Sequence, residues 1–142
     1  MAMLASPLGA APQADCPIAR LSCTTAAKSL DQALCLGVQQ ALIESLPGYV
    51  VRLADDLRQT SVRPQDIAVS LQVLEQSETY ILARLDWCHG PCSVLHQGKP
   101  LRLSVMDAQL SSEMLQRFAH TLLQAHPQIL AVLPKAKRCF NK

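Results

Sequence analysis

The sequence predicts an α+β fold, a two-layer sandwich in which a four-stranded, mainly antiparallel sheet has two helices packed on one face, in the order α-β-β-β-β-α. Two observations support this prediction. Two segments repeat apolar residues at the period of a helix, and four shorter segments alternate apolar and polar residues at the period of a strand. Elements that are apolar on one side only are expected to bury that side between the two layers.

The first helix is predicted over 29–46. Ser29 and Gln32 have the spacing of a capping box, and Pro47-Gly48 ends the segment. The apolar residues that share one side of this helix are Leu30, Leu34, Val38, Ala41, Leu42 and Leu46. This pattern predicts an amphipathic helix that covers one part of the sheet.

The second helix is predicted over 111–125, with Ser111 as the N-cap and Pro127 as the stop signal. The residues of its apolar stripe are Met114, Leu115, Phe118, Ala119, Leu122 and Leu123. His120 falls on the polar side and His126 at the end of the helix, so both are expected to be exposed to solvent.

Four segments have strand periodicity, and between the first two lies a polar stretch, 54–66, that is expected to be a loop. The strands are predicted at 49–53, 67–73, 79–87 and 101–105. The compact link "EQSE" predicts an antiparallel hairpin between the second and third strands. A longer link, 88–100, leads to the fourth strand.

Composition narrows the class of protein. With 142 residues, 49% of them hydrophobic and 17% charged, the chain suits one folded domain over 15–142, and 1–14 is expected to be a flexible leader remnant or an artificial start. No apolar run approaches the roughly 20 residues that span a bilayer. A net charge of +2 and five aromatic residues argue against nucleic acid as a partner. We expect no cofactor.

Six cysteines indicate export to the periplasm or to the outside of the cell, where disulfides persist; a cytoplasmic location is the alternative. The disulfide candidates are Cys16, Cys23, Cys35, Cys88, Cys92 and Cys139. Short spacing and Gly90-Pro91 favour a Cys88–Cys92 bridge that closes a turn. For the others we expect Cys16 with Cys23 and Cys35 with Cys139, and the alternative for Cys35 is a buried free thiol.

The stretch "DWCHGPCS" over 86–93 resembles the active site of the thioredoxin family, Trp-Cys-Gly-Pro-Cys, with one histidine inserted. The resemblance implies a thiol-disulfide oxidoreductase in which Cys88 attacks and Cys92 resolves. It covers only 87–92. In that family a long helix starts at the first cysteine, whereas here Gly98 and Pro100 leave no room for two helical turns.

A zinc site is a further alternative, because Cys88, Cys92 and His96 have a C-x₃-C-x₃-H spacing. The candidates for a fourth ligand are His89, His120 and Cys139. Structural zinc sites usually have two close pairs of ligands, and this sequence has one clear pair.

No nucleophile, phosphate-binding or metalloprotease motif occurs in the chain, so the hypothesis that needs fewest assumptions is a non-catalytic binding or accessory module of the cell envelope. The polar face of the predicted sheet is the candidate binding surface, with Arg52, Arg84 and Arg102 on it. Such a face is also what any half-buried sheet presents to water. A protein partner could also use a sheet edge or the 88–100 link.

Overall fold

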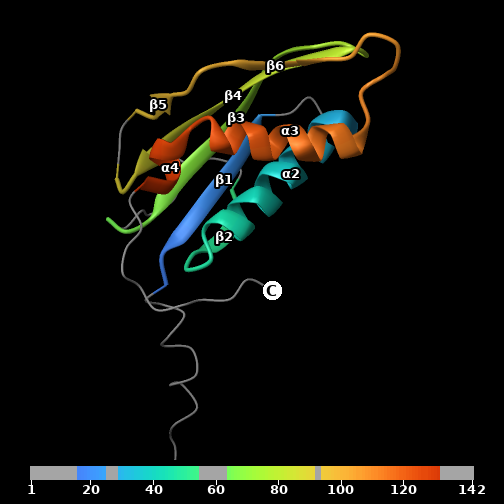
Figure 1. Ribbon diagram of the computed structural model, residues 1–142. Helices are drawn as coiled ribbons and strands as arrows, with labels where there is room; N and C mark the ends of the chain where they lie inside the picture. Colours follow the sequence, from blue (N-terminus) through green and yellow to red (C-terminus); the bar gives the residue numbers. More distant parts are fainter. Residues whose placement is uncertain (1–15, 25–28, 55–63, 92–93, 132–142) are drawn as a thin grey trace, which may run out of the picture.

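The computed structural model describes residues 16–24, 29–54, 64–91 and 94–131 and has a mixed α+β fold. The elements are β1 (Ile18–Thr24), α2 (Ser29–Ser45), β2 (Val50–Leu53), β3 (Ile67–Gln76), β4 (Tyr80–His89), β5 (His96–Gln97), β6 (Leu101–Ser104), α3 (Ser112–Gln124) and α4 (Pro127–Ala131). Figure 1 shows α2 and α3 side by side on the same face of the sheet.

The sheet has the strand order β2-β1-β3-β4-β5, and β6 also pairs with β4. β1 is parallel to both β2 and β3, whereas the other pairs are antiparallel. The hairpin of β3 and β4 is confirmed, but the sheet is larger and more mixed than the predicted four strands. The difference arises at β1, which turns α2 into the crossover of a parallel β-α-β unit.

The hydrophobic core fills the space between the sheet and the two long helices. Its fully buried large side chains are Leu21, Leu34, Leu42, Leu46, Ile67, Leu71, Ile81, Leu85, Leu115, Leu122, Leu123 and Ile129. The helices touch most closely at Gly37, where a Cβ atom would lie 3.0 Å from Ala119 Cβ and 3.1 Å from Gln116 Cα. Glycine at this position therefore permits the close approach of α2 to α3.

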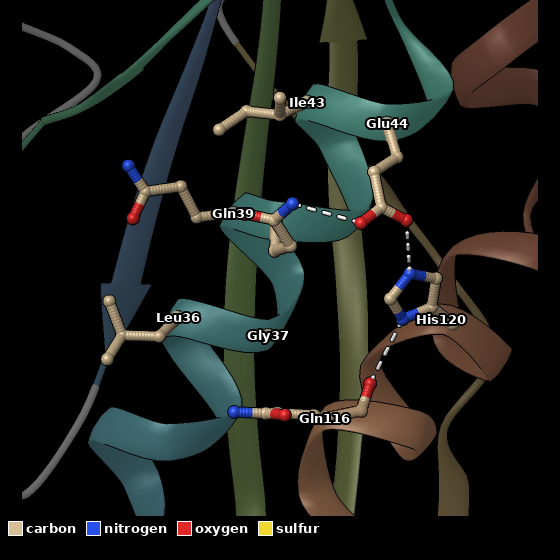
Figure 2. A pocket seen from close by; sticks show the side chains of 8 residues that line it. Leu36, Gly37, Gln39, Ile43, Glu44, Gln116 and His120 are labelled. Carbon is tan, nitrogen blue, oxygen red and sulfur yellow. Dashed lines mark hydrogen bonds and ion pairs between the residues drawn. The ribbon is translucent and has the colours of Figure 1, made fainter. Parts of the chain in front are cut away.

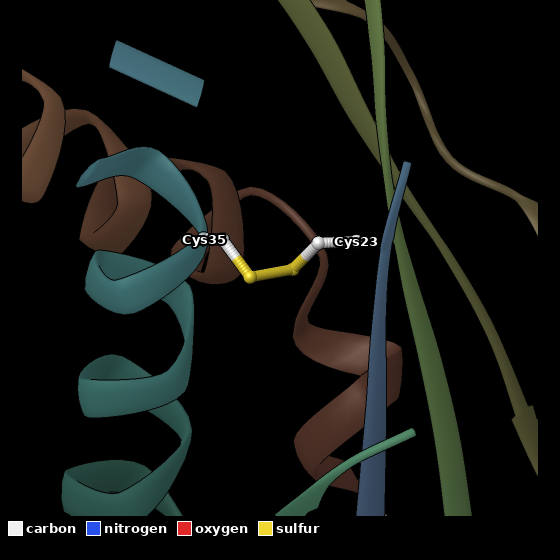
Figure 3. Close-up of a disulfide and its surroundings, with 2 residues drawn as sticks. All are labelled: Cys23 and Cys35. Atoms are coloured by element: carbon white, nitrogen blue, oxygen red, sulfur yellow. A yellow bond between two sulfur atoms is a disulfide. The ribbon is translucent and has the colours of Figure 1, made fainter. Parts of the chain in front are cut away.

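A disulfide joins Cys23 of β1 to Cys35 of α2, with a Cα–Cα distance of 6.0 Å (Figure 3). The predicted pairs Cys16–Cys23 and Cys35–Cys139 are therefore wrong, as is the free thiol at Cys35. The reason is geometric: Cys23 follows Leu21 on the side of β1 that faces the helices, and α2 runs back across that side.

Cys16 and Cys88 are also disulfide-bonded. Cys92 and Cys139 lie outside the described part of the chain. The predicted Cys88–Cys92 pair therefore also lies outside it. Within the described ranges, no helix has both the length and the apolar character that are needed to cross a bilayer.

Candidate functional site

The cysteine motif starts at the end of β4. Cys88 is 1% exposed and lies beside Ala68, on the sheet face that points away from the helices. Gly90 has a φ of 72°, which glycine adopts without strain, and its N–H donates to the Asp66 carbonyl oxygen at 2.7 Å. The chain therefore leaves β4 through a turn that is anchored to the start of β3.

This geometry differs from the thioredoxin arrangement. The next described helix after Cys88 is α3, which starts at Ser112, so among the described residues no helix starts at the cysteine motif. An attacking thiolate also needs access to its substrate, and Cys88 is buried. The surroundings of Cys88 resemble those of a structural cysteine.

The zinc alternative requires Cys88 and His96 to converge. His96 pairs with Trp87 across β4 and β5, with ring centroids 5.8 Å apart, so it lies on the opposite face of the sheet from Cys88. Among the described residues, no group of three His, Cys, Asp or Glu side chains could hold a metal ion. Cys92 lies outside these residues.

Asp66 lies at the centre of a buried polar junction at this end of the sheet. Its side chain is 0% exposed, and its two carboxylate oxygens accept from Ile18 N and from Arg20 Nη1, both at 2.9 Å. The Arg20 side chain is itself only 14% exposed. Burial raises the pKa of nearby Tyr49, and the Asp66 charge raises it further. The junction holds the first residues of β1 and β3 together.

A second buried junction fixes the link between β5 and β6. His126 is 3% exposed, Nδ1 lies 2.7 Å from the Leu122 carbonyl oxygen, and Nε2 accepts from the Lys99 N–H at 2.9 Å. A Cβ atom at Gly98 would overlap with the Leu85 carbonyl oxygen and with His126 Nε2. The expectation of an exposed His126 is therefore wrong, because the backbone of 98–99 packs over the ring.

The three predicted surface arginines share the outer face of the sheet but do not form one cluster. Arg84 pairs with Asp86 at 3.0 Å, and Asp86 also accepts from the Gly98 N–H at 3.3 Å. Arg102 lies over the Tyr80 ring, 4.2 Å from its centroid. Arg52, on β2, is exposed, and its side chain forms no ion pair or hydrogen bond within the described ranges.

A groove of about 480 Å³ lies between α2 and α3 on the side away from the sheet (Figure 2). The residues that line it are Leu36, Gly37, Gln39, Gln40, Ile43, Glu44, Gln116 and His120. Leu36 is 59% exposed. The groove thus combines apolar side chains from α2 with side-chain amides and one carboxylate–histidine pair.

The carboxylate–histidine pair is formed by Glu44 of α2 and His120 of α3, with Oε1 and Nε2 3.1 Å apart. Hydrogen bonds from Gln40 and His120 hold the pKa of Glu44 below its usual value. Glu44 in turn raises the pKa of His120, and the backbone of Gln116 raises it further. The sequence placed His120 correctly on the polar side of its helix but gave no sign of its partner.

Sequence reasoning missed both Asp66 and Glu44. Asp66 carried a weak signal, since it directly precedes the alternating segment that begins at Ile67. Its partner Arg20 is 46 residues away in the chain, on a strand that was not predicted. Glu44 and His120 are 76 residues apart, so no local pattern links them.

Comparison with protein-family models, with curated proteins and with solved structures finds no match to this chain. The class that the structure itself defines is a disulfide-containing α+β domain.

Proposed function

We propose that the protein is an exported, disulfide-stabilised binding or accessory module of the cell envelope, without catalytic activity of its own. The observation that carries this proposal is the state of the cysteines. All four cysteines in the described ranges are disulfide-bonded, and one bridge ties the sheet to the helix layer. Disulfides of this structural kind persist in the periplasm and outside the cell.

The environments of the ionisable groups support a passive role. Asp66 and Asp86 are buried and paired with arginines, and both ring nitrogens of the buried His126 are hydrogen-bonded to main-chain groups. A general acid or base needs a side chain that can reach a substrate, and these groups face protein atoms instead. Among the residues that line the groove, Glu44 and His120 are the only acid and base.

For the partner we propose the outer face of the sheet as the contact surface and a protein of mixed charge as the ligand. The exposed charged residues on this face are Arg52, Arg102 and Glu75, because the pairs Arg20–Asp66 and Arg84–Asp86 are largely buried. The excess is a single positive charge, which is too small to attract a polyanion. It suits the polar rim of a protein–protein contact.

Thiol state in protein from its native compartment tests the export part of this proposal. We expect alkylation to add no mass before reduction and six labels after reduction, because the proposal places all six cysteines in disulfides. The measurement is intact mass with and without reductant. Six free thiols in the untreated protein would contradict export, and a pool in which only Cys88 and Cys92 cycle would favour the oxidoreductase instead.

Charge reversal tests the binding part. A photo-cross-linking residue at Ser104 on the outer face should give a discrete adduct with one polypeptide in native cells. The double variant Arg52→Glu and Arg102→Glu should reduce its yield at least tenfold, since a wrong-sign pair of charges costs more than about 1.4 kcal/mol. Arg117→Glu is the matched control, because Arg117 is exposed on α3, on the opposite side of the molecule. An adduct that survives the double variant, or no adduct, would refute the proposed surface.

A further inference from the structure

His120 makes two hydrogen bonds whose acceptors are both oxygen atoms. Nδ1 lies 3.1 Å from the Gln116 carbonyl oxygen on its own helix, and Nε2 lies 3.1 Å from Glu44 Oε1 on the neighbouring helix (Figure 2). A carbonyl oxygen and an ionised carboxylate can only accept hydrogen bonds. Both ring nitrogens of His120 must therefore carry a hydrogen for both contacts to form.

Only the imidazolium form of histidine has a hydrogen on each ring nitrogen. A neutral ring keeps one of them, so it must give up either the bond to Gln116 or the bond to Glu44. The Gln116 contact lies within one turn of α3, whereas the Glu44 contact is the one that crosses between helices. Deprotonation therefore removes the ion pair between the two helices, because a neutral ring retains at most one uncharged donor for Glu44.

We propose that Glu44 and His120 form a proton-operated clasp between α2 and α3, closed as an ion pair when His120 is an imidazolium and opened, by loss of that ion pair, when the ring is neutral. Glu44 is positioned for this role, because its other carboxylate oxygen accepts from Gln40 Nε2 at 2.9 Å. Both clasp residues line the groove, so opening changes the shape of that groove. The clasp is a property of the helix layer and does not depend on the proposed function.

No other charged side chain in the described ranges competes for His120. On α3, Glu113 and Arg117 face each other at 4.0 Å. In the adjoining sheet, Arg84 and Asp86 of β4 point to the opposite face, and α4 has no ionisable side chain.

His126 provides an internal contrast. Its Nδ1 faces the Leu122 carbonyl oxygen and must carry a hydrogen, whereas its Nε2 accepts from the Lys99 N–H and must not. The neutral ring satisfies both contacts. Of the two histidines at this end of α3, only His120 thus has a geometry that requires the charged form.

The raised pKa of His120 sets the direction in which the clasp depends on pH. The hydrogen bond to Glu44 is the largest cause that raises the pKa of His120 above its ordinary value of 6.5, and the bond to Gln116 also raises it, while burial opposes them. A folded pKa above the unfolded one means that the clasp is fully closed below pH 6.5 and is lost as the pH rises through the folded value. Since both side chains are half exposed, the clasp is also expected to weaken in high salt.

The experiment is an NMR titration of the full chain from about pH 5 to about pH 9, which spans the range in which histidine changes charge. We expect both ring nitrogens of His120 to be protonated at low pH and the backbone amides of Gln40 and Gln116 to shift with the midpoint of His120. Glu44→Gln should lower that midpoint, because it removes the carboxylate. Glu113→Gln, the same change on an exposed residue of α3, should leave it unchanged.

Either of two results would overturn the clasp. One is a His120 midpoint that is the same in the Glu44→Gln variant and in the unaltered protein. The other is that the amide chemical shifts of Gln40 and Gln116 stay constant while His120 titrates, since the helices would then not respond to the proton. Both variants change solvent-exposed side chains, so both are expected to fold.

Discussion

Replacing Asp66 with alanine should lower the free energy of unfolding by about 3–5 kcal/mol, the cost of removing one partner of a buried ion pair. The change leaves the Arg20 guanidinium, only 14% exposed, without its carboxylate, and it leaves the Ile18 N–H without its acceptor. β1 should detach first at this end, because both lost contacts belong to it. Urea unfolding with the disulfides intact measures the effect.

Two further variants complete this test. Asp107→Ala removes an exposed carboxylate from the connection before α3 and should change stability by no more than about 0.5 kcal/mol. Asp66→Asn keeps an oxygen that can accept from Ile18 but loses the charge, so its effect should lie between the other two. If the alanine variant does not fold, the comparison of Asp66→Asn with the unaltered protein provides the test. If Asp66→Ala and Asp107→Ala were equally stable, the junction would not be a stabilising element.

The double variant Cys23→Ala and Cys35→Ala should lower the free energy of unfolding by about 3 kcal/mol, the value for a bridge that closes a loop of roughly 15 residues. The two cysteines are 12 residues apart in the chain. The bridge acts mainly by limiting the unfolded chain, so the variant should also expose more surface on unfolding and show a steeper dependence on urea. Urea unfolding without reductant gives both quantities.

The comparison protein for this test is Ser22→Ala, which changes the neighbouring residue of β1 without touching the bridge. Its unfolding curve should match that of the unaltered protein to within about 0.5 kcal/mol. If the double variant kept the free energy and the slope of the unaltered protein, the Cys23–Cys35 bridge would contribute nothing to stability.

The helices and the central hairpin could be predicted from local patterns. The segment predicted over 29–46 is α2, Ser29–Ser45, and the one predicted over 111–125 is α3, Ser112–Gln124, with the Ser111 side chain accepting from Met114 N as an N-cap does. Each of these features depends on residues within a few positions of one another. Periodicity and capping are therefore visible without a partner.

β1 and the polar junctions could not be predicted in the same way. β1 is a seven-residue strand whose pairing with β2 and β3 is parallel, and parallel neighbours are far apart in sequence. Missing β1 also meant that Cys23 could not be placed opposite Cys35. His126 has the sequence context of an exposed helix end, and only the approach of Gly98 and Lys99 buries it.

The sequence by itself determined that this protein has an α+β fold with two amphipathic helices and a hairpin, because those elements follow from the spacing of apolar residues along short stretches of chain. The tertiary structure alone decided the strand order, the Cys23–Cys35 pairing and the contacts of Asp66, His120 and His126. The physical reason is distance along the chain: each of these features joins groups that meet only after the helices have packed on the sheet.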